Sequence, residues 1–262
     1  MNTQKKSHST ESVVTTVFLH GFSGDGDGLR AFADVYAGKD AVCINLPGFG
    51  GATSSPLGAS SDIREYCKAV WAEVRRAVPT GSIYLVGHSH GAMIGYVLAL
   101  QHPDEVIGLD LFCPVARPRL APRLSIGFLY FLRRVGLPVS FIIKFVAHPI
   151  LVSLVTRYSF RPDWSREVRQ QIMRMREREA YFYSPVMFDL MEQTLRFKKE
   201  MDGTKCVVPT QICYVTDENV ASDTDFAWYE AHTPVQKSVA MTGGHLCVVA
   251  DPQGVSRKFK EN

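Results

Sequence analysis

A serine between two glycines is the feature of this sequence that most clearly predicts chemistry. The motif Gly-His-Ser-His-Gly at residues 87–91 follows an apolar run at 83–86 and precedes a helical pattern. A serine held in a sharp turn between a strand and a helix needs very small residues two positions away, because the backbone passes close to neighbouring chain there. The motif therefore predicts Ser89 as a nucleophile, whereas the alternative is a chance pentapeptide in a loop.

A serine nucleophile needs a base, because its hydroxyl is almost entirely un-ionised at neutral pH. The chain has eight histidines. His245 follows two glycines and a short apolar stretch near the C-terminus, which suits the chain order nucleophile, acid, base. We predict His245 as the base, and we expect the side chains of His88 and His90 to point away from the Ser89 hydroxyl.

The base in turn needs a carboxylate that orients its ring. Asp217 lies two residues after the apolar run 211–215 and precedes His245 in the chain, so we predict Asp217 as this acid. The alternative is that Asp217 caps a turn. Four other carboxylates compete with it, namely Glu218, Asp223, Asp225 and, at the end of an earlier run, Asp110.

Apolar runs alternate with helical patterns, which is typical of an α/β fold with a mostly parallel, twisted sheet flanked by helices. We expect strands at 13–19, 41–45, 83–86, 106–112 and 211–215. Between Pro114 and Lys205 the pattern becomes purely helical. We therefore predict a core domain made of residues 13–114 and 205–262, with residues 115–204 inserted as a helical cap.

With these motifs the chain resembles the α/β-hydrolase superfamily, and its esterase-like and lipase-like members in particular, from Val13 to about Lys258. The motif Val-Phe-Leu-His-Gly-Phe at residues 17–22 is similar to the family's strand that precedes the oxyanion hole. The resemblance implies that the backbone N–H groups of Phe22 and His90 bind the oxyanion. A plain turn after a strand is the alternative interpretation of this motif.

Acyl transfer is the chemistry that these residues favour, so we expect a carboxylic ester hydrolase acting on an ester or thioester with a hydrophobic acyl or aromatic group. In the family a helical cap roofs the pocket, which makes Phe128, Phe131 and Phe182 candidate substrate contacts, although they could equally pack the cap against the core. His20 is either a further contact or a structural residue. Three alternatives stay open: a carbon–carbon bond hydrolase, an acyltransferase and a ligand receptor without activity.

Other classes of function have little support. No metal-binding motif and no dinucleotide fingerprint occurs, so we expect neither a metal nor a cofactor. A net charge of +3 is too small to predict nucleic-acid binding. The apolar region 135–155 is broken by prolines and a lysine, which predicts a lid that could touch lipid and no transmembrane segment. Six scattered cysteines and a polar N-terminus favour reduced thiols and a cytoplasmic location.

Overall fold

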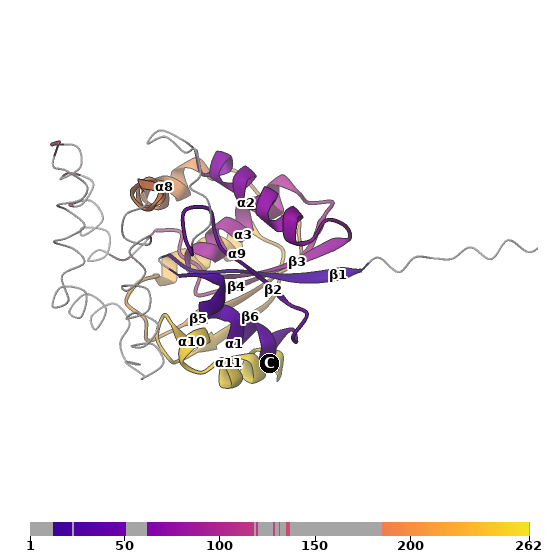
Figure 1. The fold of residues 1–262 in the computed structure, drawn as a ribbon. Helices are drawn as coiled ribbons and strands as arrows, with labels where there is room; N and C mark the ends of the chain where they lie inside the picture. The colour runs from indigo at the N-terminus through magenta and orange to yellow at the C-terminus, as the bar shows by residue number, and fades with distance from the viewer. Residues whose placement is uncertain are drawn as a thin grey trace, which may run out of the picture.

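A parallel sheet lies at the centre of the chain (Figure 1). The computed structural model describes residues 13–22, 24–50, 62–117, 119, 128, 131, 135–136 and 185–261. Within these residues the strands are β1 (Val14–Leu19), β2 (Val42–Ile44), β3 (Ser82–His88), β4 (Val106–Phe112), β5 (Thr210–Val215) and β6 (Val235–Met241). They follow the order β2-β1-β3-β4-β5-β6, and every pair is parallel. All carboxyl ends of the strands therefore lie along one edge.

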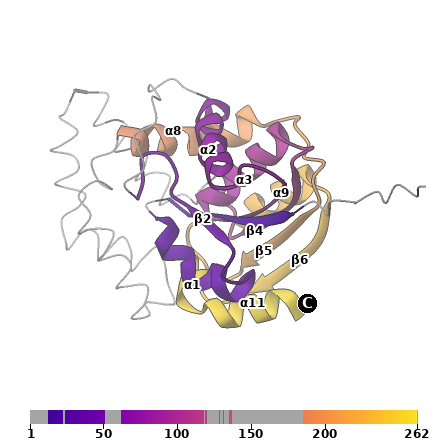
Figure 2. The ribbon, with the colours of Figure 1, turned by 45° about the vertical axis from the view of Figure 1, so that its right-hand side comes forward.

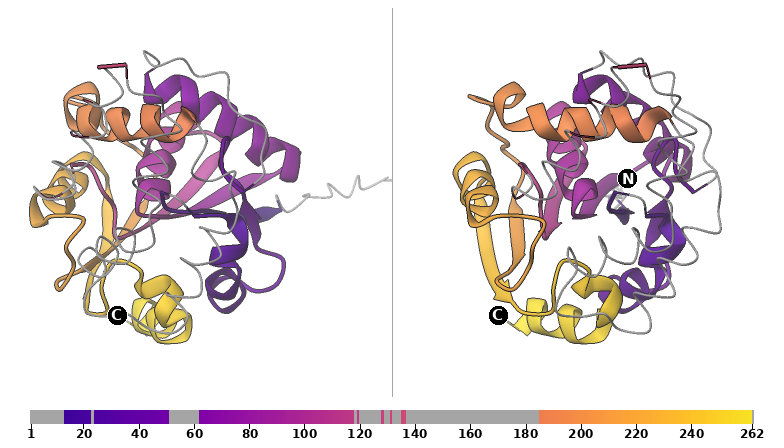
Figure 3. Two further views of the ribbon diagram at one scale, coloured as in Figure 1. Left: turned by 60° about the vertical axis from the view of Figure 1, so that its left-hand side comes forward. Right: turned by 90° about the vertical axis from the view of Figure 1, so that its left-hand side faces the viewer.

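Helices cover both faces of the sheet, which confirms the predicted α/β fold. One face carries α2 (Ile63–Ala77), α3 (His90–Gln101) and α9 (Asp223–His232), and the other carries α1 (Gly26–Tyr36), α10 (Cys247–Ala250) and α11 (Pro252–Glu261) (Figures 1 and 2). The remaining described helix, α8 (Pro185–Glu200), lies on the opposite side of the sheet from α11, as the orange and yellow helices of Figure 3 show.

The central strands are apolar on both faces because each face packs against helices. In β3, Leu85 belongs to the hydrophobic core under α2 and α3, whereas its neighbour Val86 belongs to the core under α1 and α11. In β1, Leu19 belongs to the first of these cores and Phe18 belongs to the second. Uninterrupted apolar runs in the sequence therefore correspond to strands buried on both sides.

The strand β6 does not appear among the strands expected from the sequence. It forms the edge of the sheet, and Gln236, Ser238 and Ala240 are exposed while Val239 and Met241 are buried. A strand with one solvated face alternates polar and apolar residues instead of forming an apolar run. The alternation explains why the search for apolar runs misses β6, whereas β2 at the other edge lies in the predicted apolar run 41–45.

Most of the predicted cap at 115–204 lies outside the described residues, so the cap and the domain boundaries stay predictions. Of its described part, α8 packs against the core, where the ring of Phe197 lies 6.1 Å from that of Tyr96 on α3. Phe128 and Phe131 are 54% and 56% exposed.

Two further expectations concern the solvent environment of the chain. In the part of the chain that the structure describes, none of the helices combines the length and the apolar character needed to cross a membrane. All six cysteines are free thiols, as expected. The cytoplasmic location stays a prediction.

Candidate active site

Ser89 occupies the tight turn between β3 and α3. Its backbone has φ 56° and ψ −117°, a conformation that costs a non-glycine residue of the order of 1–3 kcal/mol and persists only where surrounding structure holds it. Here the Ser89 N–H donates to the Phe112 carbonyl at the end of β4 (2.8 Å), and the Ser89 carbonyl accepts from Ala92 (3.1 Å). The strained turn is thus anchored to a neighbouring strand and to the first turn of α3.

The two glycines of the motif are required sterically. A Cβ atom at Gly91 would lie 2.1 Å from the carbonyl oxygen of Leu19, and a Cβ atom at Gly87 would lie 2.5 Å from Cα of Ala92. Both obstacles are backbone atoms, which cannot swing aside as a flexible side chain can. The sequence-based expectation that both positions need very small residues is confirmed.

His245 lies against the nucleophile, as its place in the chain predicts. Its Nε2 is 2.7 Å from Oγ of Ser89. The loop after β6 brings it there through Gly243 and Gly244, which have φ angles of 126° and 68°. These are left-handed conformations that glycine adopts without strain. Ser89 and His245 are 7% and 3% exposed, so the pair is shielded from bulk water.

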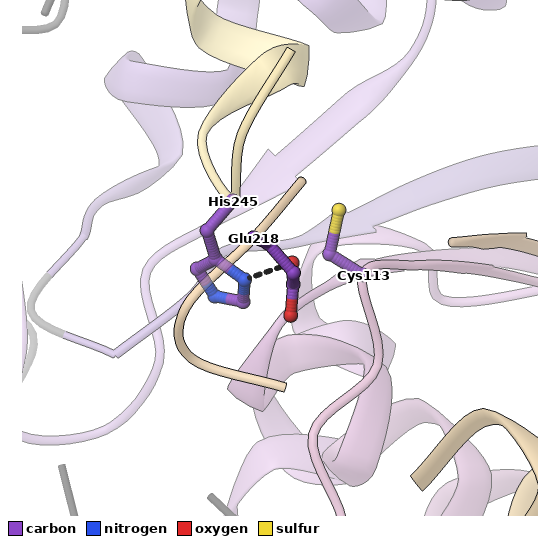
Figure 4. Close-up of side chains that lie close together, drawn as sticks. All are labelled: Cys113, Glu218 and His245. Carbon is purple, nitrogen blue, oxygen red and sulfur yellow. Dashed lines mark hydrogen bonds and ion pairs between the residues drawn. The ribbon is translucent and has the colours of Figure 1, made fainter. Parts of the chain in front are cut away.

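The carboxylate against His245 belongs to Glu218, and not to Asp217 as predicted. Oε2 of Glu218 lies 2.8 Å from Nδ1 of His245 (Figure 4), and Oε1 accepts the N–H of Ala221 at 2.5 Å. Asp217 is exposed and accepts the N–H groups of Gly243 (3.1 Å) and Gly244 (3.3 Å). Because the two neighbouring side chains leave the turn in different directions, only Glu218 reaches the imidazole.

Two of the other candidate acids have structural partners elsewhere. Asp110 accepts the hydroxyl groups of Tyr36 (2.6 Å) and Tyr84 (2.8 Å). Asp225 closes the capping box of α9 and forms an ion pair with Lys198 of α8 at 2.9 Å. Asp223 is the first residue of α9. No sequence signal separates Glu218 from Asp217, since both follow the same strand.

The two histidines beside Ser89 are both buried and uncharged. Nε2 of His88 lies 2.7 Å from the backbone carbonyl oxygen of His245, to which it donates. Burial, with a smaller contribution from the nearby His245, lowers the pKa of His88 to about 3. Burial likewise lowers the pKa of His90 to about 3. His88 therefore holds the loop that carries His245, a contact that the sequence did not reveal.

The loop after β1 lies directly against the nucleophile turn. A Cβ atom at Gly21 would lie 3.2 Å from Cβ of Ser89, and the ring of Phe22 stands edge-on to that of His90 with the ring centroids 5.8 Å apart. Phe22 and His90 thus flank Ser89 from two different segments. Their backbone N–H groups as the oxyanion hole stay a prediction.

Of the candidate substrate contacts, His20 is the one whose side-chain hydrogen bonds the structure gives. Both ring nitrogens of His20 are engaged, since Nδ1 donates to the Gly21 carbonyl (2.8 Å) and Nε2 accepts the N–H of Leu46 (3.0 Å). His20 therefore joins two loops through its ring nitrogens, and its contact with a substrate stays a prediction. The substrate contacts of Phe128 and Phe131 remain untested, and Phe182 lies outside the described residues.

A possible set of metal ligands coincides with the same site. Atoms of Cys113, Glu218 and His245 lie within 4.8 Å of one another (Figure 4). However, Nδ1 of His245 already faces Glu218, and a hydrogen bond with Cys247 together with burial raises the pKa of the Cys113 thiol well above its ordinary value. Because metals bind the thiolate, this donor set does not suit a metal, and we assign none.

Two known proteins match parts of this sequence. A monoacylglycerol lipase of Xenopus laevis is 24% identical over 214 residues, which cover 79% of this chain and 62% of the lipase. A 2-succinyl-6-hydroxy-2,4-cyclohexadiene-1-carboxylate synthase of Salmonella agona is 32% identical over 93 residues, or 36% of this chain and 35% of the synthase. The matched segments thus span less than two thirds of either relative.

Solved structures and a family model match the chain over almost its whole length. A lipase-esterase related protein of Clostridium acetobutylicum superposes with a TM-score of 0.70 at 14% identity, covering 96% of this chain and 95% of that protein. At this identity the likeness concerns the fold alone. The model of the alpha/beta hydrolase family matches residues 16–258, and the chain therefore belongs to the α/β-hydrolase family.

Proposed function

We propose that the chain is a serine hydrolase that cleaves an ester or thioester of a hydrophobic acyl or aromatic substrate. The observation that carries this proposal is the continuous hydrogen-bonded series from Glu218 through His245 to Ser89, with distances of 2.8 and 2.7 Å. A buried nucleophile, base and orienting acid in this order is the arrangement that activates a hydroxyl for acyl transfer. Family membership and the lipase among the relatives support the same reaction class.

Each residue then has a defined role. Nδ1–H of His245 donates to Glu218, which leaves Nε2 free of a proton and able to accept the proton of Ser89 Oγ as this oxygen attacks the substrate carbonyl. The backbone N–H groups of Phe22 and His90 stabilise the oxyanion that develops. His245 then gives its proton to the leaving group, and the acyl-enzyme on Ser89 is hydrolysed by a water that His245 deprotonates. No step needs a cofactor.

The test is hydrolysis of p-nitrophenyl esters from acetate to palmitate by the wild type and by Ser89→Ala. We expect turnover by the wild type and a loss of at least about 1,000-fold in the variant, because removal of a triad serine abolishes the acyl-enzyme route. Ser238→Ala on the exposed side of β6 is the matched control and keeps full activity. The preferred acyl length measures the depth of the pocket.

The alternatives predict different outcomes of this test. A folded wild type without turnover on any ester contradicts the proposal and favours a carbon–carbon bond hydrolase, an acyltransferase or a ligand receptor. Product analysis after addition of an alcohol or amine separates acyl transfer from hydrolysis.

Contact with a lipid surface is a further part of the proposal. Phe128, Phe131 and Val135 are 54%, 56% and 56% exposed, and the Val135 N–H donates to the Phe131 carbonyl, which places them at helical spacing. Exposed apolar side chains on one helical face favour insertion at a membrane interface. We expect the wild type to sediment with phospholipid vesicles and Phe131→Ser to do so less. Equal recovery of both in the supernatant contradicts lipid contact.

A further inference from the structure

The ring of His90 sits between the nucleophile turn and α8. Its Nδ1 lies 3.4 Å from the hydroxyl oxygen of Thr194, a residue of α8, and its ring packs edge-on against Phe22. The side chains of His90 and Thr194 are both buried, with residue exposures of 3% and 7%. His90 directly follows Ser89 in the chain, and its ring contacts Phe22 from the loop after β1, which itself lies against Ser89.

The partners of Thr194 determine which ring nitrogen of His90 carries the proton. The Thr194 hydroxyl donates its only hydrogen to the Leu190 carbonyl at 2.8 Å, so its oxygen can only accept from His90. Nδ1 of His90 therefore carries the proton and donates it. A neutral imidazole has one N–H, and the pKa of about 3 that burial imposes keeps this ring neutral. Nε2 is left as a lone-pair acceptor.

This acceptor is buried and has no hydrogen-bond partner among the residues that the structure describes. A buried acceptor without a partner costs free energy, and native structures rarely leave one unless water or a ligand completes it. The position beside Ser89 and Phe22 makes the substrate the natural source of the missing donor. A hydroxyl is the donor that an ester substrate can carry without adding charge.

We propose that Nε2 of His90 binds a hydroxyl group of the substrate, so that the enzyme prefers hydroxylated esters to esters in which a methyl group replaces that hydroxyl. This inference rests on the proposed esterase function and specifies its substrate class. His90 is then a specificity-determining residue whose backbone N–H and side chain act on different parts of one substrate. Thr194 is a positioning residue that sets the tautomer.

Two pairs of esters test this inference and separate the two places that the hydroxyl can occupy. In the first pair, 2-hydroxyethyl butanoate and propyl butanoate, the hydroxyl of the first ester lies on the alcohol. In the second pair, ethyl 3-hydroxybutanoate and ethyl 3-methylbutanoate, the hydroxyl of the first ester lies on the acyl group. Hydrolysis of each ester is measured by titration of the released acid. The readout is the ratio of the two kcat/KM values within each pair. A general loss of activity in a variant lowers kcat/KM for both esters of a pair equally and leaves their ratio unchanged.

We expect the wild type to prefer the hydroxylated member of one pair by about 5- to 10-fold, as one hydrogen bond allows. His90→Phe, which keeps a ring and removes both nitrogens, brings that ratio to about 1. Thr194→Val lowers the ratio because the tautomer is no longer held, whereas Thr194→Ser preserves it. Turnover of all four esters with wild-type ratios near 1 overturns the inference alone. No turnover of any ester overturns the esterase function as well.

Discussion

Oε2 of Glu218 lies 2.8 Å from Nδ1 of His245, while the carboxylate of the preceding Asp217 faces the N–H groups of Gly243 and Gly244. Two consecutive acidic residues thus serve the same loop in different ways. Glu218 orients the imidazole ring, and Asp217 supports the glycine turn that delivers it. This division allows a matched pair of amide substitutions to distinguish their roles.

We expect Glu218→Gln to lower kcat by about 1,000- to 10,000-fold, as in other triads whose acid becomes an amide. The Ala221 N–H requires the amide oxygen at Oε1, so the amide NH₂ turns toward Nδ1 of His245. That arrangement forces the proton onto Nε2, which can then no longer accept one from Ser89. Asp217→Asn, the control, loses less than about 10-fold, because its oxygen still accepts one glycine N–H. A larger loss in Asp217→Asn than in Glu218→Gln would contradict the assignment.

The imidazole of His88 donates a hydrogen bond to the backbone carbonyl of His245, the proposed base. Replacement of His88 by Phe removes the donor to the His245 carbonyl, so we expect kcat to fall by about 10-fold while KM for a small ester changes little. Since the pKa of His88 is about 3, it stays neutral between pH 5 and pH 9, and the shape of the pH–rate profile is retained. His88→Gln, whose amide can donate, restores part of the rate. A shift of the acidic side of the pH–rate profile in His88→Phe would reject this role.

The glycines of α3 provide a steric test. Gly91→Ala puts a Cβ atom 2.1 Å from the Leu19 carbonyl oxygen, and we expect it to cost about 3 kcal/mol or more of the free energy of unfolding. Gly95→Ala in the same helix meets only movable side-chain atoms, Cδ1 of Leu109 at 3.1 Å and Cδ1 of Leu19 at 3.6 Å, and it stays within about 1 kcal/mol of the wild type. Urea unfolding measures both variants. Equal stability of the two would argue against a close approach of β1 to the nucleophile turn.

Asp110 gives a pH dependence of stability with a defined sign. Burial raises its pKa from near 3.8 to about 6, although hydrogen bonds from Tyr36 and Tyr84 oppose the shift. The folded protein therefore holds this proton more tightly than the unfolded chain, and the resulting stability is present below pH 4 and lost as the pH rises through 6. Relative to Asp110→Asn, the wild type loses roughly 2 to 3 kcal/mol of unfolding free energy between pH 4 and pH 7. Urea unfolding of both proteins over this range measures the difference, and a difference that does not vary with pH would refute the prediction.

Local sequence patterns determined much of the fold and part of the site. Most residues of five strands are apolar, so these strands could be predicted, whereas β6 at one edge of the sheet alternates exposed and buried residues and could not. The two glycines at 87 and 91 mark the turn at Ser89 in the sequence, so the turn could be predicted, although the atom that excludes a Cβ at Gly91 belongs to Leu19 of β1. Chain order then paired Ser89 with His245, which the structure brings to 2.7 Å.

The roles of residues that look equivalent in the sequence could be distinguished only in the tertiary structure. Asp217 and Glu218 follow the same strand, and the direction in which each side chain leaves the turn depends on where β6 delivers His245. The proton on His90 likewise depends on Thr194, which lies 104 positions away in the chain. Orientation and protonation arise from contacts between distant segments, and local spacing carries no information about them.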